Sequence, residues 1–142
     1  MEIQTLYNLA QQENIEVIQF PMSINGSMSV MAEDGRCYIG IDEAVQDNSI
    51  QERTHMIHEL GHCVTGSFYN RYAAVDCRQK HENTADKWAV LQMIPAEELD
   101  QAVTDGHTEI WDLAEYFGVT EDFIRKAVCY HVHGNLATEL YF

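Results

Sequence analysis

Basic residues are scarce in this chain of 142 residues: eight Lys and Arg stand against 23 Asp and Glu, a formal net charge of −15. Proteins that bind nucleic acid need clustered Lys and Arg to contact the phosphates, so we expect no direct contact with DNA or RNA. An acidic surface attracts basic protein partners, and it also simply keeps a protein soluble. Composition leaves both explanations of the acidity open.

Long apolar runs are absent as well. No run approaches the 18 residues of a membrane-spanning helix, so we expect no membrane segment. Residues 1–4 lack the basic start and apolar stretch of a secretion signal. No two of the four cysteines form a C-x-x-C pair, and we expect four free, mostly buried thiols in a reducing cytoplasm. The cysteines are Cys37, Cys63, Cys77 and Cys129.

The length fits a single domain over residues 1–142, because a chain with 46% apolar residues can fill one core. Apolar spacing predicts a helix over 2–13, a strand near 15–18, and a hairpin of 27–31 with 37–41 around Glu33-Asp34-Gly35. Further helices are predicted at 50–65, 79–93, 95–106, 108–117 and 120–130, with a surface loop over 66–78. A helix, a small antiparallel sheet and then helices indicate the α+β class.

The most informative feature is H-E-x-x-H at residues 58–62. On a helix, His58 and His62 lie on one face and can reach the same metal ion. Glu59 can then act as general base toward a water molecule activated by zinc. The motif therefore predicts two metal ligands and one catalytic residue.

The helical context of the motif is good. Ser49 followed by Glu52 reads as a capping box, and Gly66 as the helix stop. Gly61 is unusual, because a glycine inside a helix costs about 1 kcal/mol relative to alanine. We expect another backbone to pass close to Gly61. An ordinary amphipathic helix that happens to carry two histidines is the alternative.

A catalytic zinc site needs a third protein ligand and an open fourth position. Glu82 and Asp86 lie four residues apart on the predicted 79–93 helix, so both carboxylates face one way. Glu82 can bind the metal while Asp86 accepts the N–H of a ligand imidazole. A solvated acidic face, with Asp86 paired to a neighbouring base, is the alternative.

Other ligands compete with Glu82. His81 differs from Glu82 in direction by about 100° on the helix, so only one of the two faces the histidine pair. His55 lies three residues before His58 and is expected at the rim of the site rather than on the metal. Cys63 points about 100° away from His62 and is a poor candidate.

The H-E-L-G-H sequence at 58–62, the pattern E-x-x-A-D-x-W-A at 82–89 and the segment Leu-Gln-Met-Ile-Pro at 91–95 resemble the ImmA/IrrE metallopeptidase family. The resemblance covers most of the chain, through Tyr130. It implies a zincin-like fold with a small sheet, a zinc ion held by His58, His62 and Glu82, and Glu59 as catalytic glutamate. The E-x-x-x-D spacing is also similar to that of thermolysin-type peptidases, in which the aspartate supports a ligand; this implies the same role for Asp86.

The C-terminal part contains a helix-turn-helix-like segment around Gly118. Residues 108–130 hold five Asp and Glu against Arg125 and Lys126, a net charge of 2 − 5 = −3, so a DNA-reading role is disfavoured. A packed helical unit is the better interpretation, and it can also serve as a docking surface. Its expected core residues are Trp111, Leu113, Phe117, Phe123, Ile124 and Val128.

Four aromatic residues outside these motifs carry open roles. His131 and His133 would share one face if the chain were extended there, although ordinary packing is favoured. Tyr69 and Tyr72 lie in the loop after the motif helix. A phenol there can stabilise an oxyanion, but it more often anchors a loop.

The expected function is that of a cytoplasmic, zinc-dependent endopeptidase. By resemblance, its target is a repressor-type, helix-turn-helix transcription regulator of a phage, another mobile element or stress genes. Attraction between an acidic enzyme and a basic DNA-binding protein fits this expectation. The alternative is a binding module that inactivates a repressor without cutting it and uses zinc as a structural element. A DNA-binding regulator is a third possibility. The oligomeric state is not predicted.

Overall fold

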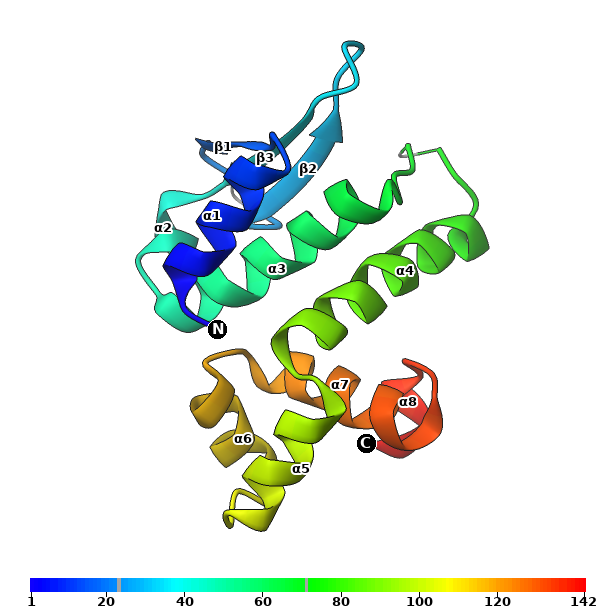
Figure 1. The fold of residues 1–142 in the computed structure, drawn as a ribbon. Helices are drawn as coiled ribbons and strands as arrows, with labels where there is room; N and C mark the ends of the chain where they lie inside the picture. The colour runs from blue at the N-terminus through cyan, green and yellow to red at the C-terminus, as the bar shows by residue number, and fades with distance from the viewer. Residues whose placement is uncertain (23, 71) are drawn as a thin grey trace.

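Three strands and eight helices form over residues 1–22, 24–70 and 72–142, which this computed structural model describes. The strands and α1 to α3 occupy one end of the molecule, α4 runs alongside α3, and α5 to α8 gather at the other end (Figure 1). The N-terminal elements are α1 (Ile3–Gln12), β1 (Glu16–Gln19), β2 (Ser27–Met31), β3 (Cys37–Ile41), α2 (Glu43–Gln46) and α3 (Ser49–Thr65). The remaining helices are α4 (Val75–Met93), α5 (Ala96–Thr104), α6 (Ile110–Phe117), α7 (Glu121–His133) and α8 (Thr138–Tyr141).

The sheet has the order β1-β3-β2, so β3 lies in the centre and β2 at an edge. The predicted hairpin is confirmed, with β2 antiparallel to β3 and Ser29 opposite Ile39. The expectation of a purely antiparallel sheet is wrong, because β1 pairs with β3 in parallel. The chain leaves β1, crosses to the far edge as β2, and returns through the middle as β3. The α+β class is confirmed, and the sheet within it is mixed.

The core lies between the sheet and α1, α3 and α4. Alternation along β3 turns Cys37, Ile39 and Ile41 inward, each 5% exposed or less. Fully buried residues of α1 and α3 meet them from the helical side, among them Leu6 and Leu60. This packing holds one side of α3 against the sheet and leaves another side of the helix for the site.

The ends of α3 correct one prediction and confirm another. The capping box of Ser49 and Glu52 is wrong: Asn48 caps the helix, and its side chain accepts hydrogen bonds from the backbone N–H groups of Ile50 and Gln51. Glu52 instead accepts a hydrogen bond from the Tyr7 hydroxyl at 2.9 Å. The helix does end at Gly66, whose φ of +68° suits glycine.

The predicted loop after α3 is shorter than expected. Helix α4 begins at Val75, four residues before the predicted start at residue 79, and the described residues between the two helices are 66–70 and 72–74. Arg71, within the predicted loop, lies outside the described residues. The early start brings the first turn of α4 into the segment that the scatter of aromatic residues had marked as irregular.

The C-terminal helices confirm a packed unit around Gly118. Leu113, Phe117, Phe123 and Ile124 are buried as predicted. Trp111 is 60% exposed, so its predicted place in the core is wrong.

Helix α7 continues three residues past Tyr130, so His131 and His133 lie on a helix and not on an extended strand. The Nε2 atom of His131 lies 2.7 Å from the carbonyl oxygen of Ile94, and the ring of His133 stacks on Tyr141. Both histidines therefore make packing contacts at the helical end of the molecule, as the favoured interpretation of the sequence had it.

The expectation of four free thiols is wrong. Cys37 at the start of β3 and Cys63 in α3 are joined by a disulfide, with 5.9 Å between their Cα atoms. Strand alternation turns Cys37 inward, and the helical rotation that directs Cys63 away from the face of His62 directs it toward the sheet. Cys77 and Cys129 are free.

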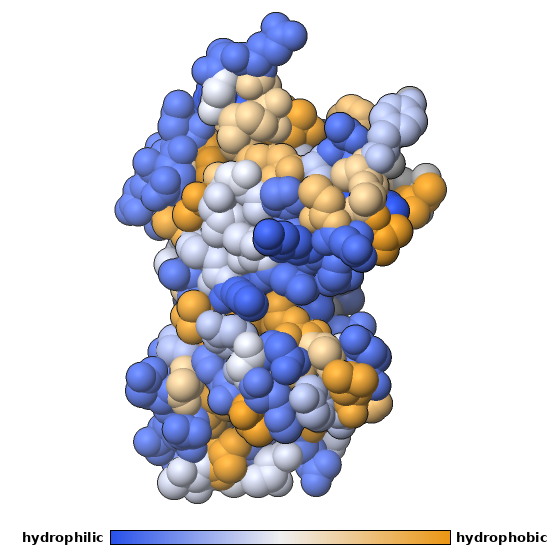
Figure 2. All heavy atoms as spheres, turned by 90° about the vertical axis from the view of Figure 1, so that its right-hand side faces the viewer, coloured by the Kyte–Doolittle hydropathy of each residue, from blue (hydrophilic) through white to orange (hydrophobic). Residues whose placement is uncertain are grey.

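The surface carries no membrane-spanning element within the described residues, because none of their helices is both long and apolar enough to cross a bilayer. The face in Figure 2 is largely hydrophilic, with apolar side chains in small groups between the polar ones.

Candidate functional site

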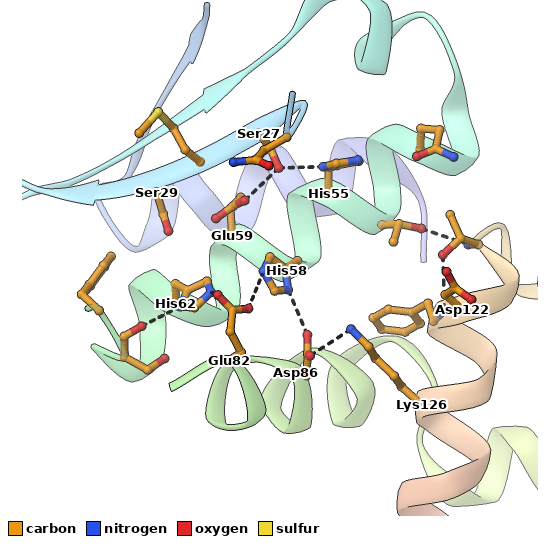
Figure 3. A pocket seen from close by; sticks show the side chains of 18 of the residues that line it. Ser27, Ser29, His55, His58, Glu59, His62, Glu82, Asp86, Asp122 and Lys126 are labelled. Atoms are coloured by element: carbon orange, nitrogen blue, oxygen red, sulfur yellow. Dashed lines mark hydrogen bonds and ion pairs between the residues drawn. The ribbon is translucent and has the colours of Figure 1, made fainter. Parts of the chain in front are cut away.

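The two motif histidines meet on one face of α3. The rings of His58 and His62 lie edge to face with 4.9 Å between their centroids. His62 is almost fully buried, whereas the His58 side chain keeps 26% of its surface exposed. Both rings point from α3 toward α4, as Figure 3 shows. The predicted one-sided placement of the pair is therefore present in the structure.

Glu82 of α4 reaches this pair. Its Oε2 lies 3.1 Å from Nε2 of His58, and its Oε1 lies 3.3 Å from Nε2 of His62. Two ligand atoms of one tetrahedral zinc ion are separated by about 3.3 Å when each bond is about 2.0 Å long. Each contact between Glu82 and an imidazole therefore has about the length expected for two ligands of one ion.

The opposite nitrogen of each ring is held by an acceptor. Nδ1 of His58 donates to Asp86 Oδ1 at 2.9 Å, and Nδ1 of His62 donates to the Ser67 carbonyl oxygen at 2.5 Å. These two contacts orient the rings so that both Nε2 atoms face Glu82. Such contacts fix the tautomer and the ring orientation of metal-binding histidines.

Asp86 in turn pairs with a cation from the C-terminal helices. Lys126 of α7 lies 3.0 Å from Asp86 Oδ2, while Oδ1 faces His58. Burial opposes ionisation of Asp86, but the hydrogen bond from His58 and the Lys126 charge outweigh it and lower its pKa. The two alternatives for Asp86, support of a ligand and pairing with a base, are therefore both present.

The site stabilises positive charge where the rings meet Glu82. Burial opposes the imidazolium form of His58, but hydrogen bonds to Asp86 and Glu82 outweigh it and raise its pKa to about 10. Burial likewise opposes the charged form of Glu82, and hydrogen bonds from His58, His62 and Tyr69 lower its pKa below its ordinary value. A cation placed between these side chains is favoured electrostatically.

Glu59 lies beside the pair on the sheet side of α3 and is 6% exposed. Its Oε2 accepts a hydrogen bond from the Ser27 hydroxyl of β2 at 2.8 Å. The other oxygen, Oε1, does not share this hydrogen bond. Glu59 thus stands next to His58 without entering the set of contacts that Glu82 makes.

The rival ligands lie elsewhere. The ring of His81 lies beside Tyr69, with 6.3 Å between centroids. His55 faces β2, where its Nδ1 lies 2.7 Å from Ser27 Oγ, in agreement with a place at the rim. Cys63 is used by the disulfide.

Tyr69 contacts Glu82, although its place in a loop predicted mainly an anchoring role for it. Its hydroxyl donates to Glu82 Oε1 at 2.6 Å, although the side chain is 40% exposed. This hydrogen bond, together with partial burial, raises the pKa of Tyr69 to about 12, so the phenol keeps its proton at neutral pH. Its position in the loop after the motif helix was the available signal, but loop aromatics more often serve as anchors.

An open cleft surrounds these residues, bordered by β2, α3, α4 and the start of α7 (Figure 3). Within the described residues, two groups offer ligand atoms within 4.8 Å of one another. The first is His58, Glu59 and His62, and the second is His58, Glu82 and Asp86. Asp86 faces Nδ1 of His58, on the other side of the ring from Glu82, and Glu59 is held by Ser27. His58 is common to both groups, and Glu82 is the carboxylate that contacts both imidazoles. Two imidazoles and a carboxylate form a ligand set that suits zinc.

Comparison with known proteins agrees with this geometry. The profile of the IrrE N-terminal-like domain, a peptidase family, matches residues 10–128. This range includes the sheet, both site helices and most of α7. No curated protein and no solved structure gave a significant match. The chain therefore belongs to the IrrE N-terminal-like family of metallopeptidases, which is the ImmA/IrrE family that its sequence motifs resemble.

Proposed function

We propose that the protein is a zinc-dependent endopeptidase in which His58, His62 and Glu82 hold the metal and Glu59 is the general base. The observation that carries the proposal is the approach of Glu82 to both Nε2 atoms, at 3.1 and 3.3 Å. Membership in a metallopeptidase family supports the same reaction class. The open cleft beside the four side chains gives a polypeptide access to them.

His58, His62 and Glu82 would hold a zinc ion there, which would supply Lewis-acid chemistry toward a scissile carbonyl and a water molecule. Glu59 takes a proton from the attacking water and later passes it to the leaving amine. Asp86 and the Ser67 carbonyl oxygen keep the two imidazoles in the tautomer that presents Nε2. The open side of the cleft is where the peptide bond has to lie.

We further propose that the substrate is a basic, helix-turn-helix repressor of a phage, another mobile element or stress genes. Cleavage in the cytoplasm follows from this substrate class alone, because the Cys37–Cys63 disulfide removes the argument from free thiols. The net charge of −15 favours association with a basic protein. The same charge, and the net −3 over residues 108–130, disfavours direct binding of nucleic acid by α6 and α7.

The test is incubation of the purified, zinc-loaded protein with the repressor encoded beside its gene, followed by mass spectrometry of the products. Wild-type protein is expected to give two fragments that meet at one peptide bond. Glu59→Gln and chelator treatment should each abolish them, while Glu59→Gln keeps its fold and zinc. An intact complex with no fragments overturns the peptidase assignment in favour of a binding module that blocks the repressor. Fragments from Glu59→Gln would remove the general-base role.

A further inference from the structure

Ser27, the first residue of β2, lies between two side chains of α3. Its hydroxyl oxygen is 2.8 Å from Glu59 Oε2 and 2.7 Å from Nδ1 of His55. Figure 3 shows the three side chains in a row along the edge of the cleft. Glu59 and Ser27 are each 6% exposed, so bulk water does not compete freely for either hydrogen bond.

The direction of the two hydrogen bonds follows from the donors available. An ionised carboxylate only accepts, so the single hydroxyl proton of Ser27 goes to Glu59. The contact with His55 then requires Nδ1 of that ring to be the donor. Burial lowers the pKa of His55, and the Glu59 charge opposes this only in part, which favours the neutral ring. The chain of hydrogen bonds therefore runs from His55 through Ser27 to Glu59.

The backbone before Ser27 is shaped to bring the strand this close. Gly26 has φ +77°, and a Cβ there would lie 2.8 Å from the side chain of Val45 and 3.1 Å from the His55 ring. The Gly26 carbonyl oxygen also accepts from the Asp42 N–H at 2.8 Å, just after β3 ends. A bulkier residue at position 26 would push β2 away from α3 and lengthen the Ser27 contacts.

A general base works only when its oxygen is correctly placed, and a displacement of about 1 Å can cost 100-fold in rate. The place of Glu59 on α3 fixes its backbone but does not by itself fix the rotation of its carboxylate. The Ser27 hydroxyl holds Oε2, and thereby sets the rotation of the carboxylate about its last bond and the direction of Oε1.

We propose that Ser27 is a positioning residue: oriented by His55, its hydroxyl fixes the Glu59 carboxylate for proton transfer. This inference rests on the proposed peptidase function. It adds Ser27 of the edge strand β2 and His55 of the preceding turn of α3 to the residues that support Glu59.

The first test is spectroscopic and independent of activity. Long-range proton–nitrogen correlation NMR of the zinc-loaded protein reports the tautomer of each histidine, and His55→Gln identifies the His55 signal. We expect His55 to carry its proton on Nδ1 in the wild type and to lose that preference in Ser27→Ala. A wild-type His55 protonated on Nε2 alone overturns the hydrogen-bond chain.

The second test is kinetic and uses fluorescently labelled casein if the natural substrate is not in hand. Ser27→Ala is expected to lower kcat by roughly 10- to 100-fold with little change in KM and with one zinc ion still bound. Ser27→Thr keeps the hydroxyl and should restore most of kcat. Ser49→Ala removes an exposed serine hydroxyl at the first position of α3, outside the cleft, and is the control for loss of a serine side chain.

The outcomes separate the two proposals. A wild type that gives no chelator-sensitive cleavage of casein or the repressor overturns the peptidase assignment, and the positioning role with it. A wild type that cleaves while Ser27→Ala keeps the wild-type kcat overturns the positioning role alone. Loss of kcat in both Ser27→Ala and Ser27→Thr, with the His55 tautomer unchanged, also contradicts it, because the defect then does not follow the hydroxyl.

Discussion

Gly61 of α3 lies against the backbone of Ala85 of α4, so closely that a Cβ at position 61 would come within 2.6 Å of the Ala85 carbonyl oxygen. The contact joins the helix that carries both histidines to the helix that carries Glu82 and Asp86. It confirms the expectation that another backbone passes close to this glycine. The spacing of the two site helices, and so the approach of Glu82 to the imidazoles, depends on residue 61 having no Cβ.

Gly61→Ala should therefore destabilise the protein even though alanine is the better helix former. Relief of the glycine penalty gains about 1 kcal/mol, but a backbone clash in a packed core costs about 1–3 kcal/mol and forces the helices apart. We expect a lower free energy of unfolding in urea and weaker zinc binding. Gln51→Ala, at an exposed position of the same helix, is the control and should stay within about 0.5 kcal/mol of wild type. A variant at least as stable as wild type, with unchanged zinc affinity, would show that the close approach has no structural role.

Lys126→Met should weaken zinc binding without removing a ligand. The substitution leaves the buried Asp86 carboxylate without its cation, so Asp86 holds His58 less firmly. We expect roughly a 10-fold loss in zinc affinity, measured by competition with a chromophoric chelator. Arg125→Met is the matched control, because its partners Asp122 and Glu121 lie on the same exposed helix turn. Equal affinities for the two variants would mean that α7 does not contribute to the site.

Tyr69→Phe tests the phenol that the sequence alone did not single out. The pKa near 12 keeps the hydroxyl protonated, so it acts as a donor to Glu82 at neutral pH. Removing it should weaken zinc binding about 10-fold, because the carboxylate loses one of its orienting contacts. Tyr116→Phe on α6 removes a half-exposed phenol outside the cleft and should bind zinc as the wild type does. A Tyr69→Phe variant with wild-type zinc affinity would limit Tyr69 to anchoring the loop.

The disulfide between Cys37 and Cys63 should contribute measurably to stability. It closes a loop with a sequence separation of 26, for which loss of chain entropy in the unfolded state corresponds to about 3.5 kcal/mol. Urea unfolding with and without a thiol reductant measures the contribution. Cys37→Ser should unfold as the reduced wild type does, and Cys77→Ser should resemble the oxidised wild type. Identical unfolding curves with and without reductant would contradict the prediction.

Much of the site was predictable because the information is local. Four-residue spacing on a helix places His58 beside His62 and Glu82 beside Asp86, and this holds whatever the rest of the fold is. The hairpin of β2 and β3 follows in the same way from alternation around a turn at Glu33-Asp34-Gly35.

Contacts between distant segments were not predictable from spacing. The pairing of Asp86 with Lys126 joins residues 40 positions apart, and the contact of Ser27 with Glu59 joins residues 32 apart. The parallel pairing of β1 with β3 and the disulfide also join segments that are distant in the sequence. At the start of α3, Asn48 and Ser49 are both good capping residues. The backbone is extended at Asn48, so Asn48 is the N-cap and Ser49 is the first helical residue. The first turn of α4 is exposed at Val75, Asp76 and Cys77, so its early start does not come from burial; Asp76 lies there at the positive end of the helix dipole, which favours local helix formation.

The central claim is that two imidazoles and the carboxylate of Glu82 hold one zinc ion, and zinc titration of purified variants tests it most directly. Elemental analysis and chelator competition should give one zinc ion per wild-type chain and an affinity at least about 100-fold lower for Glu82→Ala. His81→Ala, which removes the neighbouring rival ligand, should bind zinc as the wild type does. A Glu82→Ala variant that binds zinc as tightly as wild type, or a His81→Ala variant that loses it, would contradict the account.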